Sequence, residues 1–588
     1  LFVVAGLLVA GAFSGNMWWA YRGRPAFVPT TPEMEALAQY RNAFEPVRKL
    51  AMMVGGVIMF FFAGTDASSH WDTFLLWRNA VPFGSVDPQF GLDVSFFTAT
   101  LPWLRVVIGV VNTAVVTGFV VAAAMHYIYG GLRAQSGERT SAAARVQLSV
   151  LGGLYLLSHG TSLWLDRFDL ATTDNSLITG LQYTDVHAVL PGTTVLAGIA
   201  IVCAALFFAN AVRRNWALPA LGTGLMIISS ILIAGVWPGV VQQFQVKPNE
   251  QAKESAYIAR SIANTRAAYG VADAKVEPYT ATDTVDAAAM AKAQATLNGI
   301  RLMDPSLLGP TFQQLQQIKG FYSFADSLDV ARLLKNGKPQ ESVVAVREVN
   351  LAGIPESQRN WVTSTLIYTH GIGVVAAADN AVTADGQPDF YESDVPPSGA
   401  LNITQPRVYF GENSPTYSIV GAPKGSTARE LDYPDDTKAN GQQTYTYAGK
   451  GGVPLGSAVN RLLFAMRFSE QNILLSNAIS SSSRILYVRQ PRARVEKVAP
   501  WLTVDSDAYP VVVDGRILWV LDGYTTSSTY PYAQHTNLGD AARDSVTNPA
   551  FDLQGRSINY VRNAVKATVD AYDGTVHLYA WDLSLIHI

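Results

Sequence analysis

The first 238 residues contain six long apolar stretches, and the rest of the chain contains none of comparable length. Each stretch is long enough to cross a bilayer, which requires about 20 apolar residues in a helix. Residues 195–208 (VLAGIAIVCAALFF) are apolar all round, whereas helices at the surface of a soluble core keep one polar face. The pattern therefore predicts six membrane spans, at residues 1–20, 47–64, 106–129, 146–165, 189–212 and 216–237.

Basic residues gather in alternate loops between these stretches. Ten Lys or Arg residues lie in or beside the loops after the first, third and fifth stretches, against three for the other two loops. Membrane proteins keep basic loops in the cytoplasm, so the last predicted span runs outward. The sequence therefore predicts a multi-pass plasma-membrane protein in which everything after Trp237 lies outside the cytoplasm.

Two segments between the spans have helical patterns of their own. Residues 68–81 place Trp and Leu residues at roughly helical spacing, which predicts an amphipathic helix in the outer membrane interface. Residues 31–45 open with Thr-Pro-Glu, which predicts a helix that Pro46 ends. The second of these helices is expected to lie in the cytoplasm.

From residue 245 onward the composition becomes polar and mixed, and the pattern alternates between helices and strands. Hairpins are predicted at Asp514-Gly515 and Asp573-Gly574, because this dipeptide favours a tight turn. Residues 385–397, rich in Asp and Pro, are expected to form an exposed loop. We predict helices at 249–269, 285–297, 310–319 and 458–475, and strands at 343–349, 362–368, 407–410, 417–420 and 484–488.

The predicted fold class is therefore a multi-pass α-helical membrane domain, residues 1–240, followed by a large α+β extracytoplasmic region, residues 245–588. Cys203 is the sole cysteine and lies within the fifth stretch, so disulfides do not stabilise the outer region. A net charge of −3 gives no argument for a nucleic-acid partner. The predicted partners of the protein are the lipid bilayer and an envelope lipid, polymer or protein.

Titratable side chains gather at the predicted outer ends of the fourth and fifth spans. Carboxylates and imidazoles there suit a divalent cation or a proton relay, although such residues more often cap helices and bind headgroups. His370 is a weaker candidate for a general base, and Asp505 with Asp507 for a calcium site. The candidate metal ligands are His159, Asp166, Asp169, Asp174, Asp185 and His187.

Several strings resemble the uncharacterised protein family 0182, a group of large multi-pass membrane proteins of actinobacteria. They include FGLDVSFF at 90–97, YTDVHA at 183–188, RILYVRQPRARVEKVAPWL at 484–502 and WVLDGYTTSSTYPYAQ at 519–534. The resemblance implies a bacterial plasma-membrane protein with about seven spans and a large external region, and it implies no catalytic residues. Since the chain begins within an apolar run and departs from the family at 583–588, we expect a truncated chain whose last six residues are not native.

Three functions stay open. Phosphate-loop, dinucleotide, zinc-helix and nucleophile-elbow motifs are absent from the sequence, which favours a non-enzymatic cell-envelope binding or scaffold protein. The alternative is a transporter or lipid-handling membrane protein, suggested by His159 and the acidic outer loops. The second alternative is a membrane-bound metal-dependent hydrolase or transferase that uses the acidic cluster.

Overall fold

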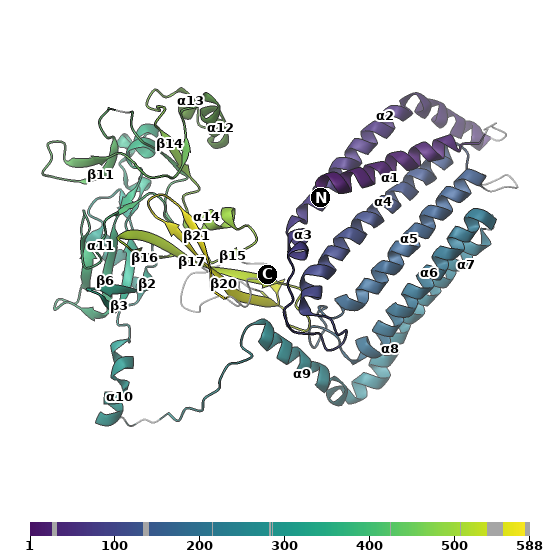
Figure 1. Cartoon of the computed structure of the whole chain (residues 1–588), viewed down its shortest axis with the longest axis horizontal. Helices are drawn as coiled ribbons and strands as arrows, with labels where there is room; N and C mark the ends of the chain where they lie inside the picture. The colour runs from purple at the N-terminus through teal and green to yellow at the C-terminus, as the bar shows by residue number, and fades with distance from the viewer. Residues whose placement is uncertain are drawn as a thin grey trace.

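The protein is described here from a computed structural model, which describes residues 1–25, 32–132, 140–213, 216–281, 284, 286–423, 425–505, 507–537 and 557–582. Long helices form the N-terminal half, and a β-rich region forms the C-terminal half (Figure 1). The residues 583–588, predicted to be non-native, lie outside the described part of the chain.

Five helical segments in the described part of the chain are long and apolar enough to cross a membrane. Large apolar side chains such as Val4, Phe62 and Ile201 are exposed on their outer surfaces, where a soluble protein rarely leaves so large an apolar area. The first, second, third, fifth and sixth predicted spans are therefore confirmed as apolar helices. The five segments are Phe2–Arg22, Ala38–Ser69, Phe96–Ile128, Asp185–Arg213 and Ala217–Ala268.

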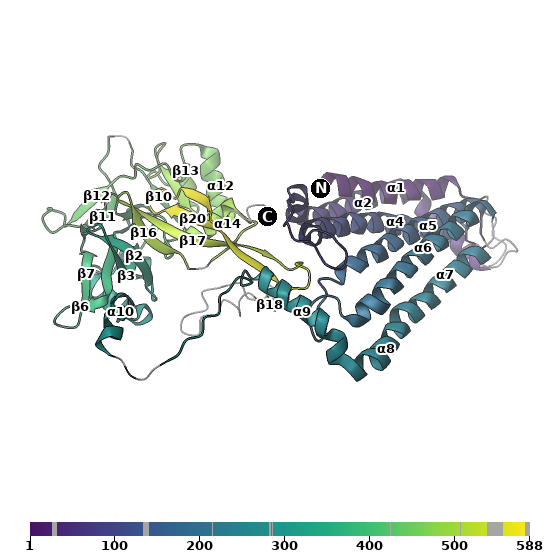
Figure 2. The ribbon, with the colours of Figure 1, turned by 60° about the horizontal axis from the view of Figure 1, so that its bottom comes forward.

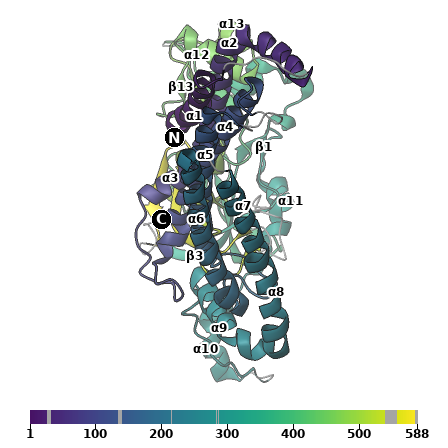
Figure 3. The same ribbon diagram turned by 90° about the vertical axis from the view of Figure 1, so that its right-hand side faces the viewer.

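The fourth predicted span is a helix, but it is less apolar than these five. This helix, α5 (Ala142–Asp169), lies between α4 (Leu101–Ile128) and α6 (Leu190–Arg213), with α7 (Ala217–Ser229) beyond α6 (Figure 3). Polar side chains pair inside the bundle on α5: Asn210 Nδ2 donates to Ser149 Oγ at 2.8 Å. Its lower hydropathy thus reflects a central position rather than a surface one.

The chain stays helical well beyond the last apolar stretch. The sequence predicts a span that ends at Trp237 and a separate helix at 249–269, but the structure joins them into one run. Pro238 lies in this run between two π-helical turns, which accommodate the backbone hydrogen bond that a proline cannot make. The run comprises α7, η3 (Ser230–Val236), α8 (Trp237–Val241), η4 (Gln242–Val246), η5 (Lys247–Asn249) and α9 (Glu250–Ala268).

Two shorter predicted helices differ in extent. The helix predicted at 31–45 belongs to α2 (Pro32–Ser69), so the predicted stop at Pro46 is wrong. Packing of α2 along α1 (Phe2–Arg22) offsets the hydrogen bond that Pro46 removes. The helix predicted at 68–81 is confirmed as the shorter α3 (Trp71–Arg78). Further π-helical turns, η1 (Phe96–Thr100) and η2 (Asp185–Val189), precede α4 and α6.

The first large sheet of the C-terminal half has five antiparallel strands in the order β2-β3-β6-β7-β8. Helices α10 (Ala287–Asn298) and α11 (Pro305–Gln316) precede it in the chain. Its strands are β2 (Asp329–Lys335), β3 (Lys338–Val346), β6 (Val374–Val382), β7 (Pro388–Ser393) and β8 (Ser398–Gly399).

The second large sheet has the order β15-β17-β20-β21, and β16 also pairs with β17. Its strands are β15 (Thr503–Val504), β16 (Tyr509–Val513), β17 (Arg516–Ser527), β20 (Tyr560–Asp570) and β21 (Val576–Ala580), and α14 (Pro491–Val498) packs against it. Both predicted hairpins, β16–β17 and β20–β21, are confirmed.

Smaller sheets and helices complete the region. The three-stranded sheet contains β10 (Tyr417–Val420), β14 (Arg484–Tyr487) and β13 (Val453–Pro454). The two-stranded pairs are β1 (Tyr322–Ser323) with β4 (Glu348–Val349), β5 (Gly371–Ile372) with β9 (Arg407–Val408), β11 (Glu430–Pro434) with β12 (Gln442–Tyr445), and β18 (Thr536–Asn537) with β19 (Ser557–Ile558).

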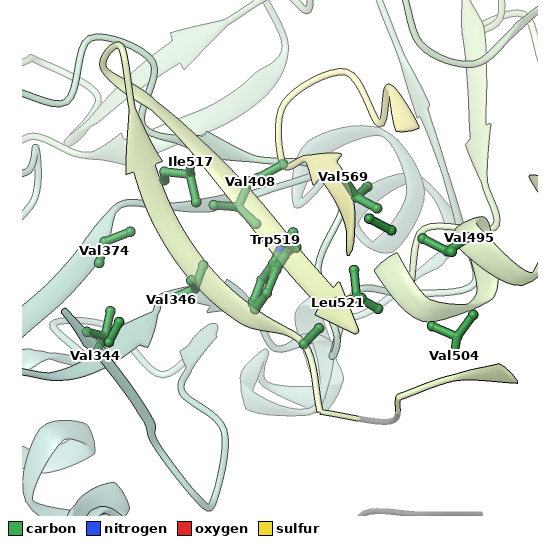
Figure 4. Packing of buried hydrophobic residues seen from close by; sticks show 14 of the residues in the cluster. Val344, Val346, Val374, Val408, Val495, Val504, Ile517, Trp519, Leu521 and Val569 are labelled. Atoms are coloured by element: carbon green, nitrogen blue, oxygen red, sulfur yellow. The ribbon is translucent and has the colours of Figure 1, made fainter. Parts of the chain in front are cut away.

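The two large sheets share one apolar core around Trp519 (Figure 4). Trp519 on β17 is 1% exposed, and its Nε1 donates to the carbonyl of Phe410 at 2.9 Å. Alternate residues of β17 face this core, which is the period of a half-buried strand. The surrounding side chains include Val344, Val346, Val374, Val495, Val504, Ile517, Leu521 and Val569.

Three local predictions in this region are wrong. Residues 362–368 form a π-helical turn, η8 (Thr363–Ile367), because Leu366 packs into the core beside Ile419. The predicted loop 385–397 contains β7, whose Glu392 is buried in the sheet. The helix predicted at 458–475 breaks at Ser469, in a left-handed conformation, into α12 (Ala458–Phe468) and α13 (Asn472–Leu475).

Candidate functional site at the junction of helices and sheet

The segment that follows β17 docks onto the ends of the N-terminal helices. Tyr532 is 1% exposed and packs with Phe97 and Leu181, and its backbone N–H donates to the carbonyl of Ala171 at 2.7 Å. Burial, and then the neighbouring Asp87 carboxylate, raise the pKa of Tyr532. The β-rich region is thus attached to the helices by an aromatic side chain as well as by the chain itself.

The loop between α5 and α6 is shaped to receive this tyrosine. Gly180 has a φ of +95°, and a Cβ there would lie 2.5 Å from Tyr532 Cδ1. Asn175 Nδ2 donates to the Gly180 carbonyl at 2.8 Å and holds the turn. Only glycine meets both the conformational and the steric requirement.

Strand β20 also holds the end of α9. Both terminal nitrogens of Arg562 donate to the carbonyls of Ala267 and Ala268 in the last turn of that helix. A cation there satisfies unpaired carbonyls and complements the helix dipole. Tyr269 Oη lies 3.1 Å from the carbonyl oxygens of Gln534 and Ile558. The contacts between the two halves therefore involve the end of α9 as well as α4, α5 and α6.

A histidine and a carboxylate link the two halves at the edge of the junction. His535 Nδ1 lies 2.7 Å from Asp174 Oδ1, and Thr179 donates to the same oxygen at 2.6 Å. Burial by itself would raise the pKa of Asp174. The hydrogen bonds from Thr179 and His535 lower the pKa by more, so the net pKa lies below its ordinary value. This carboxylate is therefore held as an anion by its protein partners.

A pocket of about 890 Å³ opens beside the docked segment, between α3 and the second large sheet. Trp71, Leu75 and Pro102 line its helical side, and Trp501 and Tyr579 line its sheet side. Apolar pockets of this size with a few convergent polar groups are the usual form of a small-molecule site. We call this space the junction pocket.

Hydroxyl groups form one wall of the junction pocket. Thr525 is 6% exposed, and its Oγ1 has no hydrogen-bond partner among the described residues. Thr503 Oγ1 and Thr526 Oγ1 lie 3.3 Å apart, on the opposite face of β17 from Thr525. Asp72 is the one charged side chain among the described lining residues. A buried hydroxyl that lacks a partner costs free energy unless a ligand or water supplies one.

The structure disperses the predicted metal ligands among separate partners. Arg105 binds both Asp166, at 2.6 Å, and Asp169, and Asp174 faces His535. Asp185 accepts the backbone N–H of Gln182 at 2.8 Å. These contacts order the helix ends and the α5–α6 loop.

The two histidines of the set also lie apart. His159 stacks on Tyr155 with ring centroids 6.1 Å apart, and His187 stacks on Tyr183 at 4.0 Å. Within the described ranges, no three His, Cys, Asp or Glu side chains come together as a potential metal site. The divalent-cation site stays a prediction from the sequence.

Neither His370 nor Asp505 is among the described residues that line the junction pocket. His370 is 2% exposed, with Nδ1 2.9 Å from Thr369 Oγ1 and Nε2 3.4 Å from Asp432 Oδ1. The ring is thus buried and held by protein partners in this structure. Asp505 Oδ2 accepts from the Tyr524 hydroxyl at 2.9 Å, which uses one of the oxygens predicted to bind calcium.

Sequence reasoning did not identify the residues that form the junction. Trp501, Thr525 and Tyr532 were part of the strings that carry the family resemblance, but they match no catalytic motif. A usable signal was present: residues 524–529 (YTTSST) are an unbroken run of hydroxyl side chains followed by Tyr-Pro-Tyr.

Comparisons with known proteins agree with that resemblance. The model of the Uncharacterised protein family (UPF0182) matches residues 1–584. The UPF0182 proteins of Kineococcus radiotolerans and Streptomyces coelicolor are each 48% identical over 99% of this chain, and that of Leifsonia xyli is 45% identical over 96%. The chain spans 57–58% of the length of these relatives. No solved structure matches the chain.

Proposed function

Given that the chain belongs to the uncharacterised protein family UPF0182, we propose that it is a multi-pass plasma-membrane protein that binds a cell-envelope component outside the cytoplasm. In this proposal, residues 1–240 form the membrane domain and residues 245–588 form the external α+β region. The observation that carries the proposal is the junction pocket, which is lined by residues from both halves. A ligand there would contact the membrane-side helix α3 and the external sheet together.

The distribution of charge supports the external placement. The α5–α6 loop carries Asp174 and the segment 79–95 carries Asp87 and Asp93, and the β-rich region docks against both. Arg22, Arg145 and Arg213 lie at the opposite ends of the described helices, and basic residues favour the cytoplasmic side. The long helices run between these two ends (Figure 2).

Cysteine labelling on intact cells tests this orientation. In a Cys203→Ala background, we expect a membrane-impermeant maleimide to label Ala439→Cys, because Ala439 is exposed in the turn between β11 and β12. Ser136→Cys, in the loop that the sequence predicts to be cytoplasmic, should react only after lysis. The reverse pattern would overturn the external placement, and buried Cys203 itself should stay unlabelled in the parent protein.

The second candidate function is lipid handling among the helices. Polar pairs buried in the bundle favour it, such as Asn210 with Ser149 and His126 with Gln147 at 2.9 Å, because polar residues at membrane depth often mark a transport path. Movement of a fluorescent lipid between leaflets of proteoliposomes tests this candidate, and an unchanged rate removes it. The metal-dependent hydrolase or transferase rests on the sequence alone, and metal analysis of the purified chain tests it.

A further inference from the structure

Three aromatic side chains with open faces line the junction pocket. Trp501 is 54% exposed, Tyr579 52% and Trp71 41%, from both sides of the space. Rings this exposed on opposite sides of one pocket offer flat apolar surfaces to a ligand. The C–H faces of a sugar ring pack well against an aromatic side chain, because the aromatic ring is flat and apolar. The hydroxyls at the edge of the sugar stay available for hydrogen bonds.

The polar groups of the pocket suit sugar hydroxyls. Thr503 and Thr526 line the pocket with their Oγ1 atoms 3.3 Å apart, and Ser527, Ser528 and Thr529 also line it. A hydroxyl both donates and accepts, so a row of Thr and Ser side chains matches a ligand whose own groups do both. Asn79 adds an amide with the same dual capacity.

The charge of the pocket argues against a phosphate headgroup. Asp72 is the charged side chain of the described lining, and neither Lys nor Arg is among those lining residues. Phosphate sites in proteins use Arg, Lys or backbone N–H groups at a helix N-terminus. A carboxylate instead accepts hydrogen bonds from neutral hydroxyls and repels an anion.

We propose that the junction pocket binds the uncharged sugar headgroup of a membrane glycolipid. The sugar lies between Trp71, Trp501 and Tyr579 and forms hydrogen bonds with the hydroxyls of Thr503 and Thr526. The lipid tail leaves past Leu75 and Leu76 of α3, toward the apolar helices. This assignment rests on the proposed function, since it names the envelope component that the external region would bind.

Native mass spectrometry of the whole chain tests the assignment. The protein is extracted in a zwitterionic detergent, which carries no sugar, and is offered three lipids with the same acyl chains: a glucosyl diacylglycerol, a phosphatidylglycerol and a headgroup-free diacylglycerol. We expect the glycolipid to be retained at least about tenfold better than either of the others, which corresponds to one good hydrogen bond. Equal retention of all three, or a preference for phosphatidylglycerol, would overturn it.

Two substitutions link that preference to the pocket. Thr526→Val keeps the shape and removes one of these hydroxyls, so it should lower glycolipid retention about tenfold. Trp501→Ala should lower glycolipid retention at least as far. Trp237→Ala, which replaces an exposed tryptophan on α8, should leave retention unchanged. Unchanged retention in both pocket variants would exclude this site.

Free maltose, offered at the same concentration as the glycolipid, tests whether the sugar must be attached to a lipid. Binding of free maltose as strongly as the glycolipid would overturn the lipid-borne form of the ligand. These measurements use purified protein and do not depend on membrane orientation. Failure here therefore leaves the labelling test of the external placement unaffected, and failure of that test leaves the binding result standing.

Discussion

Gly180→Ala is expected to release the β-rich region from the helices. The new Cβ would lie 2.5 Å from Tyr532 Cδ1, within a ring that is 1% exposed and has no room to move. Alanine at a φ of +95° adds conformational strain of about 1–2 kcal/mol, and overpacking adds about 1–3 kcal/mol. A combined cost of about 3 kcal/mol corresponds to roughly a hundredfold weaker association.

A cleavable link measures this association directly. Residues 271–281 run between α9 and α10 as an exposed segment, in which Val276 is 94% exposed and Tyr279 90%. A site for a specific protease placed there divides the chain into two fragments that only the junction holds together. The parental fragments should co-purify after cleavage, and those of Gly180→Ala should separate.

A glycine elsewhere provides the matched control for that experiment. Gly337, in the β2–β3 hairpin, has a φ of +78°, and a Cβ there would meet no atom within 4 Å. Gly337→Ala therefore carries the conformational strain without the clash, and its fragments should still co-purify. Co-purification of the Gly180→Ala fragments as well would show that Tyr532 does not hold the two halves together.

The apolar helices were predictable because their signal is local. The span predicted at 189–212 is observed as α6, Leu190–Arg213, since an all-apolar run of that length has few alternatives. The hairpin at Asp514-Gly515 was predictable for a similar reason, because turn residues and an alternating strand pattern agree there. Residues 362–368 were not, since a short apolar run fits a strand or a helical turn equally well.

The junction was not predictable, because its contacts join residues far apart in the sequence. Nothing around Gly180 indicates that Tyr532 occupies the space beside it, and nothing around Thr525 indicates that α3 lies opposite. The predicted metal ligands show how local the sequence signal is. Composition brought Asp166, Asp174 and Asp185 together, but each has a nearer partner in Arg105, His535 or the backbone of the α5–α6 loop.

The C-terminal region should lose stability as the pH rises from about 5 to about 8, and Glu412→Gln should remove much of that loss. Burial raises the pKa of Glu348 to about 7, and burial with the nearby Glu348 and Asp507 raises that of Glu412 to about 8. Asp329, which faces the same group from β2, is also raised by burial and then by Glu412. The buried Arg489 only partly offsets this repulsion, since its guanidinium donates to Tyr409, Ser418 and Thr369 rather than to a carboxylate.

Stability falls with rising pH because the pKa values of Glu348 and Glu412 in the folded chain lie above the ordinary value of 4.5. Protonated carboxyls are favoured in the folded chain, so their contribution is fully present below about pH 4.5 and is lost as the pH rises through about 7 and 8. Glu412→Gln keeps the shape and removes one ionisation, so it should raise the free energy of unfolding at pH 8 by about 2 kcal/mol. At pH 5 the variant and the parent should differ little.

Thermal unfolding followed by near-ultraviolet circular dichroism across this pH range measures both effects. Glu277→Gln is the matched control, because Glu277 is exposed and its replacement should leave the pH profile unchanged. A parental midpoint that rises between pH 5 and pH 8 would contradict the assignment, and so would a Glu412→Gln profile parallel to the parental one. In either case the carboxylates of β2, β4 and the Glu412 segment would have to be ionised in the folded chain, which requires a cation or ordered water between them.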